Sequence, residues 1–364
     1  MRILIVCRQL NFYMSAPKCS IYLAFELAKL GIDTNILTSK VTPLARKSLE
    51  KATLHRVNPI FANKSFSPFF YTKFAHDLKN KCSCDIILGN GYTFFDDITW
   101  VHLPGLASIK RLGLKSWHQY FKARIEKLLF KTSRLLLAPS SMVAEDLKRL
   151  YDAPDKKIRV QCHGVDTEYY IPPKKRTQVI TMSCPNAKDK IRLLFVGGAP
   201  FRKGFHLLLR TLANIRNTQD LELIAIGFKP NEELQSLVAK LGLRKIVSFK
   251  GVIKTEELKT IYQSSDIFIL PSLYDPFSLV TLEAMSSGLP VIISPYVGAK
   301  DIVEDWHNGV IIDPYDISKF AEAITTLINN DRLREKIGVN ARATAEGYSW
   351  KNVAKSILEI CEHV

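Results

Sequence analysis

Short apolar runs alternate with helical patterns along the whole chain, and the alternation breaks once and then starts again. Strand, helix and strand repeated in this way predict a parallel sheet covered by helices on both faces. We therefore expect an α/β protein of two doubly wound, Rossmann-like domains that face a cleft. The runs typical of buried strands are 2–6, 34–37, 85–88, 98–102, 135–138 and 158–161, then 192–196, 221–226, 247–250, 267–270, 291–294 and 310–312.

The break in the pattern lies at residues 171–190, which hold three prolines and little periodicity. Such a segment is typical of a linker between domains. A chain of 364 residues also has room for two cores. We expect a first domain over 1–170, a linker over 171–190, a second domain over 191–347, and a helix over 348–364 that packs back on the first domain.

The composition excludes several classes of protein. No stretch approaches the roughly 20 apolar residues of a membrane helix, and the N-terminus lacks a cleavage pattern. The seven cysteines are scattered and contain no CxxC pair, which argues against a disulfide scaffold or a zinc site. We expect a cytoplasmic protein without a bound metal.

The net charge of +16 is concentrated in one half of the chain. Residues 1–182 carry 29 basic and 14 acidic residues, a net of +15, whereas residues 183–364 carry 22 and 21, a net of +1. The positive electrostatic field of such a charge excess attracts polyanions, anionic lipid surfaces or phosphorylated substrates.

A first candidate motif follows the predicted strand at 192–196. Gly197 and Gly198 come directly after this strand, and Arg202 and Lys203 stand just before a helical pattern. Glycines allow backbone amides to approach an anion, and a helix N-terminus favours negative charge. The motif suits a diphosphate, although an ordinary loop with a solvated basic pair explains it equally well, since it is neither a Walker loop nor GxGxxG.

A second candidate motif, PSLYDPFSLVTLEAMSSG, spans residues 271–288 and runs from a predicted strand through a loop into a helix. Asp275 is expected in the loop and Glu283 about one turn into the helix. Amides at the helix start suit sugar or phosphate oxygens, and a carboxylate suits the paired hydroxyls of a ribose. The alternative is that Asp275 caps a turn and Glu283 is solvated.

These motifs, in this order, resemble those of the retaining GT-B glycosyltransferases of family 4. The residues that carry the resemblance are FVGGAPFRKG at 195–204, GLRKIVSFKG at 242–251 and the run up to residue 293, supported by GVDTEYY at 164–170 and YSW at 348–350. The resemblance implies a nucleotide-diphosphate-sugar donor held by the second domain and an acceptor held by the first. It also implies transfer with retention and without a metal or other cofactor.

The resemblance also implies roles for individual residues. Arg202 and Lys203 would hold the diphosphate, Glu283 the ribose, and Asp275 the donor sugar. Backbone near Gly251 and Val252 would contact the base. The residues implied at the donor site are Gly197, Gly198, Arg202, Lys203, Val252, Asp275, Phe277, Ser278, Leu279 and Glu283, and those implied in catalysis are His102, Arg202, Lys203 and Asp275.

The sequence departs from the family pattern at three places. Asp275 stands where the family usually has Glu, and Ser278 stands where it usually has Gly. The first loop, residues 9–19, lacks the usual Gly-Gly pair. His102, at the end of a predicted strand, resembles the family histidine that reaches the donor sugar, whereas the residue on its own favours a histidine bonded to a backbone carbonyl.

Residues 108–134 combine eight basic side chains with one acidic side chain and interleaved apolar residues. This composition is typical of an interfacial helix, although a core helix with a solvated basic face has it too. We expect an acceptor that is a lipid or lipid-linked saccharide at the inner face of the cell membrane. The residues expected to meet the acceptor or membrane are Lys110, Arg111, Lys115, Trp117, Lys122 and Arg124.

Three other functions stay open at this stage. A soluble transferase of the same fold would not bind vesicles, and a nucleotide-sugar epimerase would turn over the donor without an acceptor. A nucleic-acid-binding protein would use the basic half, but no reading module is recognisable. We expect no nucleic acid among the partners.

Overall fold

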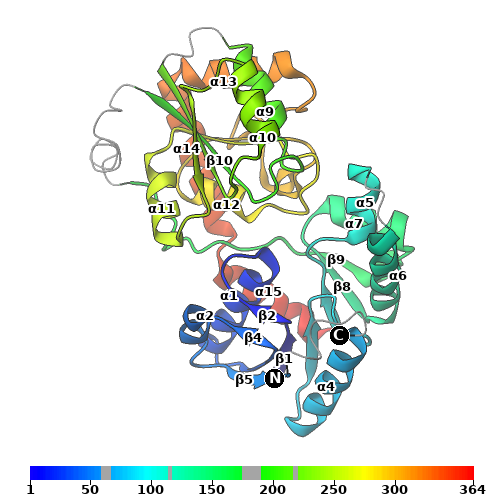
Figure 1. Ribbon diagram of the computed structural model, residues 1–364. Coiled ribbons are helices and arrows are strands. Elements are labelled where there is room, and N and C mark those ends of the chain that lie inside the picture. Colours follow the sequence, from blue (N-terminus) through cyan, green and yellow to red (C-terminus); the bar gives the residue numbers. More distant parts are fainter. Residues whose placement is uncertain (59–66, 114–116, 174–189, 216–219) are drawn as a thin grey trace. The chain divides into compact units, whose positions relative to one another are not determined.

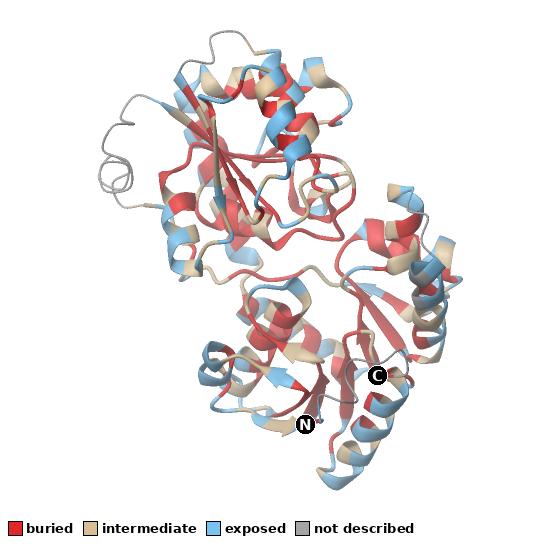
Figure 2. Ribbon diagram, viewed as in Figure 1, coloured by how far each residue is buried: buried red, intermediate tan, exposed pale blue. Residues whose placement is uncertain are grey.

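The computed structural model describes residues 1–58, 67–113, 117–173, 190–215 and 220–364. These residues form two compact units, each built on its own parallel sheet (Figure 1). The first unit contains Met1–Gly164 together with Trp350–Val364, and the second contains Val165–Ser349. The central strands of both sheets are buried, while the outward faces of many surrounding helices are exposed (Figure 2).

The first unit contains a seven-stranded sheet in the order β5-β3-β1-β6-β7-β8-β9. The central strand β1, Arg2–Val6, is apolar because both of its faces are covered, and it pairs in parallel with β3 and β6. The remaining strands of this sheet are β3 (Asp33–Thr38), β5 (Thr53–Arg56), β6 (Ile86–Gly89), β7 (Ile98–Trp100), β8 (Leu135–Ala138) and β9 (Ile158–Val160).

Two buried clusters show how helices cover this sheet. Tyr71 and Ala75, from one helix, pack on Leu4 and Ile87. Leu129 and neighbouring residues from two other helices pack around Leu136 and Ala138 in a second cluster. The helices of the first unit are α1 (Ser15–Lys29), α2 (Pro43–Ser48), α4 (Ser67–Lys81), α5 (Gly105–Leu112), α6 (Trp117–Thr132), α7 (Ser141–Tyr151) and α15 (Trp350–Glu362), with a 3-10 turn at Asp155–Lys157.

The second unit contains a six-stranded parallel sheet in the order β12-β11-β10-β13-β14-β15. The chain adds strands to one side of β10 and then crosses to the other side with β13, so the strand order reverses between these two. Its strands are β10 (Ile191–Val196), β11 (Leu221–Ile226), β12 (Val247–Gly251), β13 (Ile267–Leu270), β14 (Val291–Ile293) and β15 (Val310–Ile311).

The helices of the second unit follow the strands in turn. They are α9 (Phe205–Ala213), α10 (Glu232–Lys240), α11 (Thr255–Ser264), α12 (Leu279–Ser286), α13 (Ile317–Ile328) and α14 (Asp331–Gly347), with a 3-10 turn at Gly298–Ile302. Helix α12 is buried nearly all round, and α14 packs on α12 and α13.

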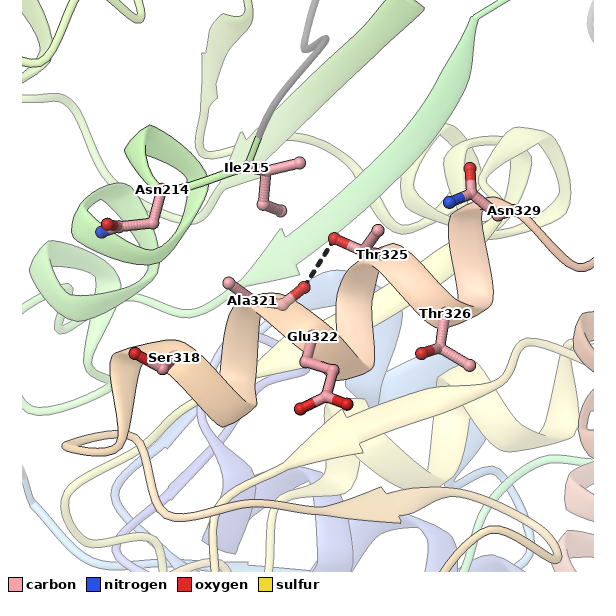
Figure 3. Close-up of a pocket in the computed structure, with 8 residues that line it drawn as sticks. All are labelled: Asn214, Ile215, Ser318, Ala321, Glu322, Thr325, Thr326 and Asn329. Carbon is pink, nitrogen blue, oxygen red and sulfur yellow. Dashed lines mark hydrogen bonds between the residues drawn. The ribbon is translucent and has the colours of Figure 1, made fainter.

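A shallow surface depression lies between the C-terminal end of α9 and one side of α13 (Figure 3). Asn214 and Ile215 line it from one side, and Ala321, Glu322 and Thr325 from the other. Helix α9 begins directly after Lys203 and rises about 1.5 Å per residue, so the depression is at the opposite end of this helix from the basic pair. It is therefore not the site that the motifs predict.

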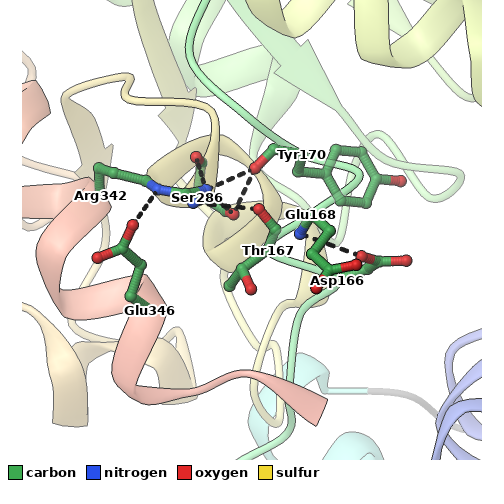
Figure 4. Close-up of polar contacts among 7 residues, drawn as sticks. All are labelled: Asp166, Thr167, Glu168, Tyr170, Ser286, Arg342 and Glu346. Carbon is green, nitrogen blue, oxygen red and sulfur yellow. Dashed lines mark hydrogen bonds and ion pairs between the residues drawn. The ribbon is translucent and has the colours of Figure 1, made fainter. Parts of the chain in front are cut away.

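The boundary between the units differs from the expected one. The segment 165–173 belongs to the second unit because Arg342 of α14 binds it (Figure 4). The Arg342 guanidinium donates to the carbonyl oxygens of Tyr170 at 2.8 Å and Thr167 at 3.1 Å, and to Ser286 of α12. Most of the expected linker, 174–189, lies outside the described residues.

The end of the chain returns to the first unit at Trp350, two residues later than the boundary drawn from the sequence. There α15 packs on α1, and the rings of Trp350 and Tyr22 stack with centroids 5.4 Å apart. A Cβ on Gly164 would approach Trp350 within 3.0 Å, so the chain passes this ring closely.

Most predicted strands coincide with observed ones to within one or two residues. The clearest difference is β7, which ends at Trp100, so His102 lies two residues beyond the strand. The sequence analysis missed β5 and the two-stranded pair of β2 (Gln9–Leu10) and β4 (Lys40–Val41). These strands are short and mix polar with apolar residues, which leaves little periodicity to detect.

Candidate functional site

The two sequence motifs of the second unit meet at the point where the strand order reverses. The loop after β10 and the loop after β13 leave the carboxyl ends of adjacent strands, which is where open α/β sheets bind ligands. The Leu273 amide donates to the Arg202 carbonyl at 2.8 Å. Gly204 has a positive φ of 71°, and a Cβ there would overlap the Pro271 carbonyl oxygen. Only glycine allows the loops this approach.

The centre of this site is an ion pair between the Lys203 ammonium and the Asp275 carboxylate. Both residues are buried, with 8% and 7% of their surfaces exposed. The neighbouring Arg202 donates through Nη1 to the carbonyl oxygen of Tyr274 at 2.7 Å. The basic pair is therefore not the solvated pair of an ordinary loop. A buried ammonium needs an anion, and here the anion comes from the other motif.

Backbone bonds hold Asp275 in place. Its amide donates to the Tyr296 carbonyl at 3.0 Å, and its own carbonyl accepts from the Gly298 amide at 2.8 Å. Asp275 thus lies in the loop, as predicted, but it does not cap α12, because the residue at the N-cap position is Ser278. This loop is fixed between the ends of β13 and β14, which orients the carboxylate toward Lys203.

The start of α12 has an unusual backbone. Ser278 adopts a φ of 81° and its side chain makes no capping bond, while its Oγ lies 2.9 Å from Oγ1 of Thr281. Phe277, Ser278 and Leu279 are all buried. The first amides of a helix lack intrahelical partners and carry the positive end of its dipole. An oxygen of a phosphate or a sugar suits this position.

Glu283 lies one turn into α12, as predicted, and only 3% of its surface is exposed. The hydroxyl of Tyr262 on α11 donates to its Oε2 at 3.2 Å. Burial and the adjacent Glu283 charge raise the pKa of Tyr262 well above its ordinary value, so this phenol remains a donor. Glu283 is therefore a buried acceptor and not a solvated helix residue. No motif in the sequence pointed to Tyr262.

Glycines line the ends of the strands beside this site. The Gly197 amide donates to the Ile226 carbonyl at 2.8 Å, and a Cβ on Gly197 would press against the Lys203 side chain at 3.1 Å. Gly198 is exposed. Val252, which follows β12, has 73% of its surface exposed.

His102 belongs to the first unit, where it lies beyond the carboxyl end of β7. Its Nε2 lies 2.7 Å from Oδ1 of Asn90, so its partner is a side-chain amide and not a backbone carbonyl. Burial, followed by the nearby His163, lowers the pKa of His102 well below its ordinary value, and burial lowers that of His163 to about 3. Both imidazoles are therefore neutral near pH 7.

The basic segment forms α5 and α6. Trp117 has 81% of its surface exposed and stacks on Phe121, and Lys110 and Arg124 are exposed. Arg111 instead forms an ion pair with the buried Asp146 at 2.7 Å. Of the other expected residues, Lys115 and the side chain of Lys122 lie outside what the structure describes.

The opposite side of α6 packs into the core. Ala123, Leu129 and Phe130 are buried, and the single acidic residue, Glu126, accepts bonds from Tyr151 and from the Gly105 amide. Burial raises the pKa of Glu126 to about 7. The helix therefore combines both interpretations of the sequence: one face is core, and the other exposes basic and aromatic side chains.

Two family models together match most of this chain. Residues 18–169 match the model of Glycosyltransferase Family 4, and residues 182–344 match that of Glycosyl transferases group 1. The first match lies almost wholly in the first unit and the second lies in the second unit. The chain belongs to glycosyltransferase family 4. It is a glycosyltransferase with the GT-B fold.

Sequence relatives of this glycosyltransferase are moderately distant. A D-inositol 3-phosphate glycosyltransferase of Corynebacterium urealyticum is 26% identical over 93% of this chain and 88% of its own. An uncharacterized glycosyltransferase of Methanocaldococcus jannaschii is 29% identical over 62% of this chain and 59% of its own. A sulfoquinovosyl transferase of Arabidopsis thaliana is 29% identical over 64% of this chain and 45% of its own.

Solved structures share the fold of this glycosyltransferase at low identity. WaaG, a glycosyltransferase involved in lipopolysaccharide biosynthesis, has a TM-score of 0.80 at 18% identity and covers 99% of both chains. HepE of Anabaena, solved in complex with UDP-glucose, has a TM-score of 0.78 at 16% identity and covers both chains fully. Among the described helices, none is long and apolar enough to cross a bilayer.

Proposed function

We propose that this glycosyltransferase moves a sugar, with retention, from a nucleotide-diphosphate-sugar to an acceptor. The observation that carries the proposal is the buried Lys203–Asp275 pair, with Arg202 beside it, at the carboxyl ends of β10 and β13. Two cationic side chains at this edge suit a diphosphate. The HepE complexes with UDP and UDP-glucose support a donor of this class.

Each side chain has a distinct role in this proposal. Lys203 exchanges its bond to Asp275 for one to a donor phosphate oxygen, and Arg202 binds the same diphosphate. The released Asp275 carboxylate then accepts from a hydroxyl of the donor sugar. Glu283 accepts from the two ribose hydroxyls, and Tyr262 keeps its carboxylate oriented. The neutral imidazole of His102 hydrogen-bonds to the donor sugar.

The reaction needs little chemistry from the protein. The bond from the anomeric carbon to the diphosphate oxygen breaks, the acceptor oxygen attacks from the same face, and its proton passes to the leaving phosphate oxygen. Negative charge grows on the diphosphate as this bond breaks. Arg202, Lys203 and the amides at the start of α12 stabilise that charge more in the transition state than in the ground state. No metal or cofactor has a role in this proposal.

A thermal-shift panel of nucleotide diphosphates and nucleotide sugars tests the donor site. A ligand that binds only the folded protein raises its apparent stability, so one nucleotide should raise the melting temperature of the parent. Lys203→Ala and Glu283→Ala should each abolish this shift, whereas Lys240→Ala, an exposed lysine at the end of α10, should keep it. Folded site variants that respond like the parent would disprove the assignment.

We propose further that the acceptor is a lipid or lipid-linked saccharide and that the enzyme acts on the cytoplasmic face of an anionic membrane. The exposed Trp117 and Phe121, with Lys110 and Arg124 nearby in the chain, support this location. Each basic residue close to an anionic surface contributes about 1 kcal/mol of binding free energy. WaaG, whose fold this chain shares, is involved in lipopolysaccharide biosynthesis, which supports such an acceptor.

Co-sedimentation with vesicles tests the membrane proposal. The parent should bind vesicles that contain an anionic lipid at low salt, bind less at high salt, and bind neutral vesicles weakly. Lys110→Glu with Arg124→Glu should weaken binding by roughly tenfold or more, because two attractive charges become repulsive. Lys240→Glu with Arg244→Glu, at two exposed positions of the second unit, is the charge-matched control. Equal binding by the two charge variants would favour a soluble acceptor instead.

A further inference from the structure

Three potential metal ligands converge in the first unit, although they are far apart in the sequence. Cys19 lies on α1, His102 follows β7 and His163 follows β9. One ligand atom from each residue, the thiol sulfur or a ring nitrogen, lies within 4.8 Å of the other two. Cys19 and His163 are buried, and His102 is half-buried.

The hydrogen bonds of Asn90 determine which nitrogen of His102 carries the proton. The Asn90 amide nitrogen donates to the Val6 carbonyl at 3.2 Å and contacts Oγ of Ser20 at 2.8 Å. The oxygen Oδ1 therefore faces Nε2 of His102, which must donate the proton. Nδ1 of His102 is left with a lone pair, and this buried atom has no hydrogen-bond partner among the residues that the structure describes.

Aromatic side chains hold the two imidazoles in place. The Trp100 ring lies 5.1 Å from both the His102 and the His163 rings, centroid to centroid, and the two imidazoles are 5.2 Å apart. Trp350 of α15 packs edge-on against Trp100. Side chains packed in this way change rotamer at a cost, so the cluster is already arranged before any ligand binds.

We propose that Cys19, His102 and His163 form a binding site for Zn²⁺. One thiolate and two imidazoles are a donor set that zinc prefers, and a tetrahedral ion keeps its fourth position for water. A histidine that binds a metal usually donates its other N–H to an oxygen acceptor, which Oδ1 of Asn90 provides for His102. On binding, the Cys19 thiol releases its proton to solvent, three coordinate bonds form and no group is oxidised.

Titration of the full chain with Co²⁺, a spectroscopic substitute for zinc, tests this site without an activity assay. The parent should bind one Co²⁺ with a thiolate-to-cobalt charge-transfer band and with visible bands as intense as tetrahedral cobalt gives. Added Zn²⁺ should abolish both. Cys19→Ser should lose the charge-transfer band and weaken binding at least tenfold, whereas Cys82→Ser, a half-buried cysteine outside the cluster, should behave like the parent.

Two further variants keep the test decisive if Cys19→Ser does not fold. His163→Gln should weaken Co²⁺ binding at least tenfold while circular dichroism stays that of the parent. Asn90→Ala, which removes the acceptor for His102, should weaken it by roughly 10–100-fold. A parent without the charge-transfer band, or a folded Cys19→Ser or His163→Gln that retains parental affinity, would overturn the proposal. Zinc and a donor sugar would compete for Nδ1 of His102, because Nε2 is bonded to Asn90. The donor thermal shift is therefore measured with a chelator present, so either proposal can fail alone.

Discussion

At the scale of single residues, Asp96 shows what the fold does to a buried carboxylate. It is fully buried after β6, and its oxygens accept bonds from the hydroxyls of Thr93 and Thr99. Loss of solvation outweighs these bonds and raises the pKa of Asp96 to about 7. At pH values between about 3.9, the pKa in the unfolded chain, and about 7, the pKa in the folded protein, the folded state holds the proton more tightly. Stability is therefore greatest at low pH in this window and falls as the pH rises through it.

Asp96→Asn should flatten the pH dependence of stability, because an amide keeps both hydroxyl partners and does not titrate. In the parent, the free energy of unfolding of the first unit should fall by up to about 1.4 kcal/mol per pH unit from this residue. Three of the four tryptophans, Trp100, Trp117 and Trp350, belong to that unit, so fluorescence in urea reports on it. Parent and variant curves that stay parallel between about pH 4 and pH 7 would contradict the assignment.

At the scale of elements, the donor site depends on how closely two loops approach. Gly204 permits this approach, because any Cβ would overlap the Pro271 carbonyl at the end of β13. Gly242, in the turn after α10, has the same positive φ of 71°, but no atom lies within 4 Å of its Cβ position. Alanine at either glycine would incur the free-energy cost of a positive φ, but only alanine at Gly204 would also clash with the other loop.

Gly204→Ala should destabilise the second unit by roughly 4 kcal/mol or more and should remove the thermal shift with nucleotide. Gly242→Ala, the matched control, should cost about 1–2 kcal/mol and keep the shift, because it bears only the left-handed penalty. Urea unfolding with the nucleotide panel measures both quantities. Equal losses in the two variants would show that the loops do not constrain each other.

For the molecule as a whole, the two units differ in how many segments of the chain they contain. The second unit is one continuous segment, Val165–Ser349, whereas the first needs the distant helix α15. Trp350, Val353 and Ile357 of α15 are buried in that unit, and Trp350 stacks on Tyr22 of α1. Removal of α15 would expose the apolar face of α1 to water.

Deletion of residues 350–364 should therefore lower the melting temperature of the first unit and leave the transition of the second unchanged. Differential scanning calorimetry resolves the two transitions if the units unfold separately. Deletion of only His363 and Val364, which lie beyond α15, is the control and should change neither. A truncated chain whose two transitions both match the parent would show that α15 adds no stability to the first unit.

The amino-acid pattern was enough to predict the two parallel sheets and the family, because strand periodicity and the motifs at 195–204 and 271–288 depend on neighbouring residues. It also placed Asp275 in its loop and Glu283 one turn into α12. The folded structure was needed to show that Asp275 pairs with Lys203, 72 residues away, and that Tyr262 binds Glu283. It alone joined Cys19, His102 and His163, since contacts between distant strand ends depend on the order of strands in the sheet, which local patterns do not specify.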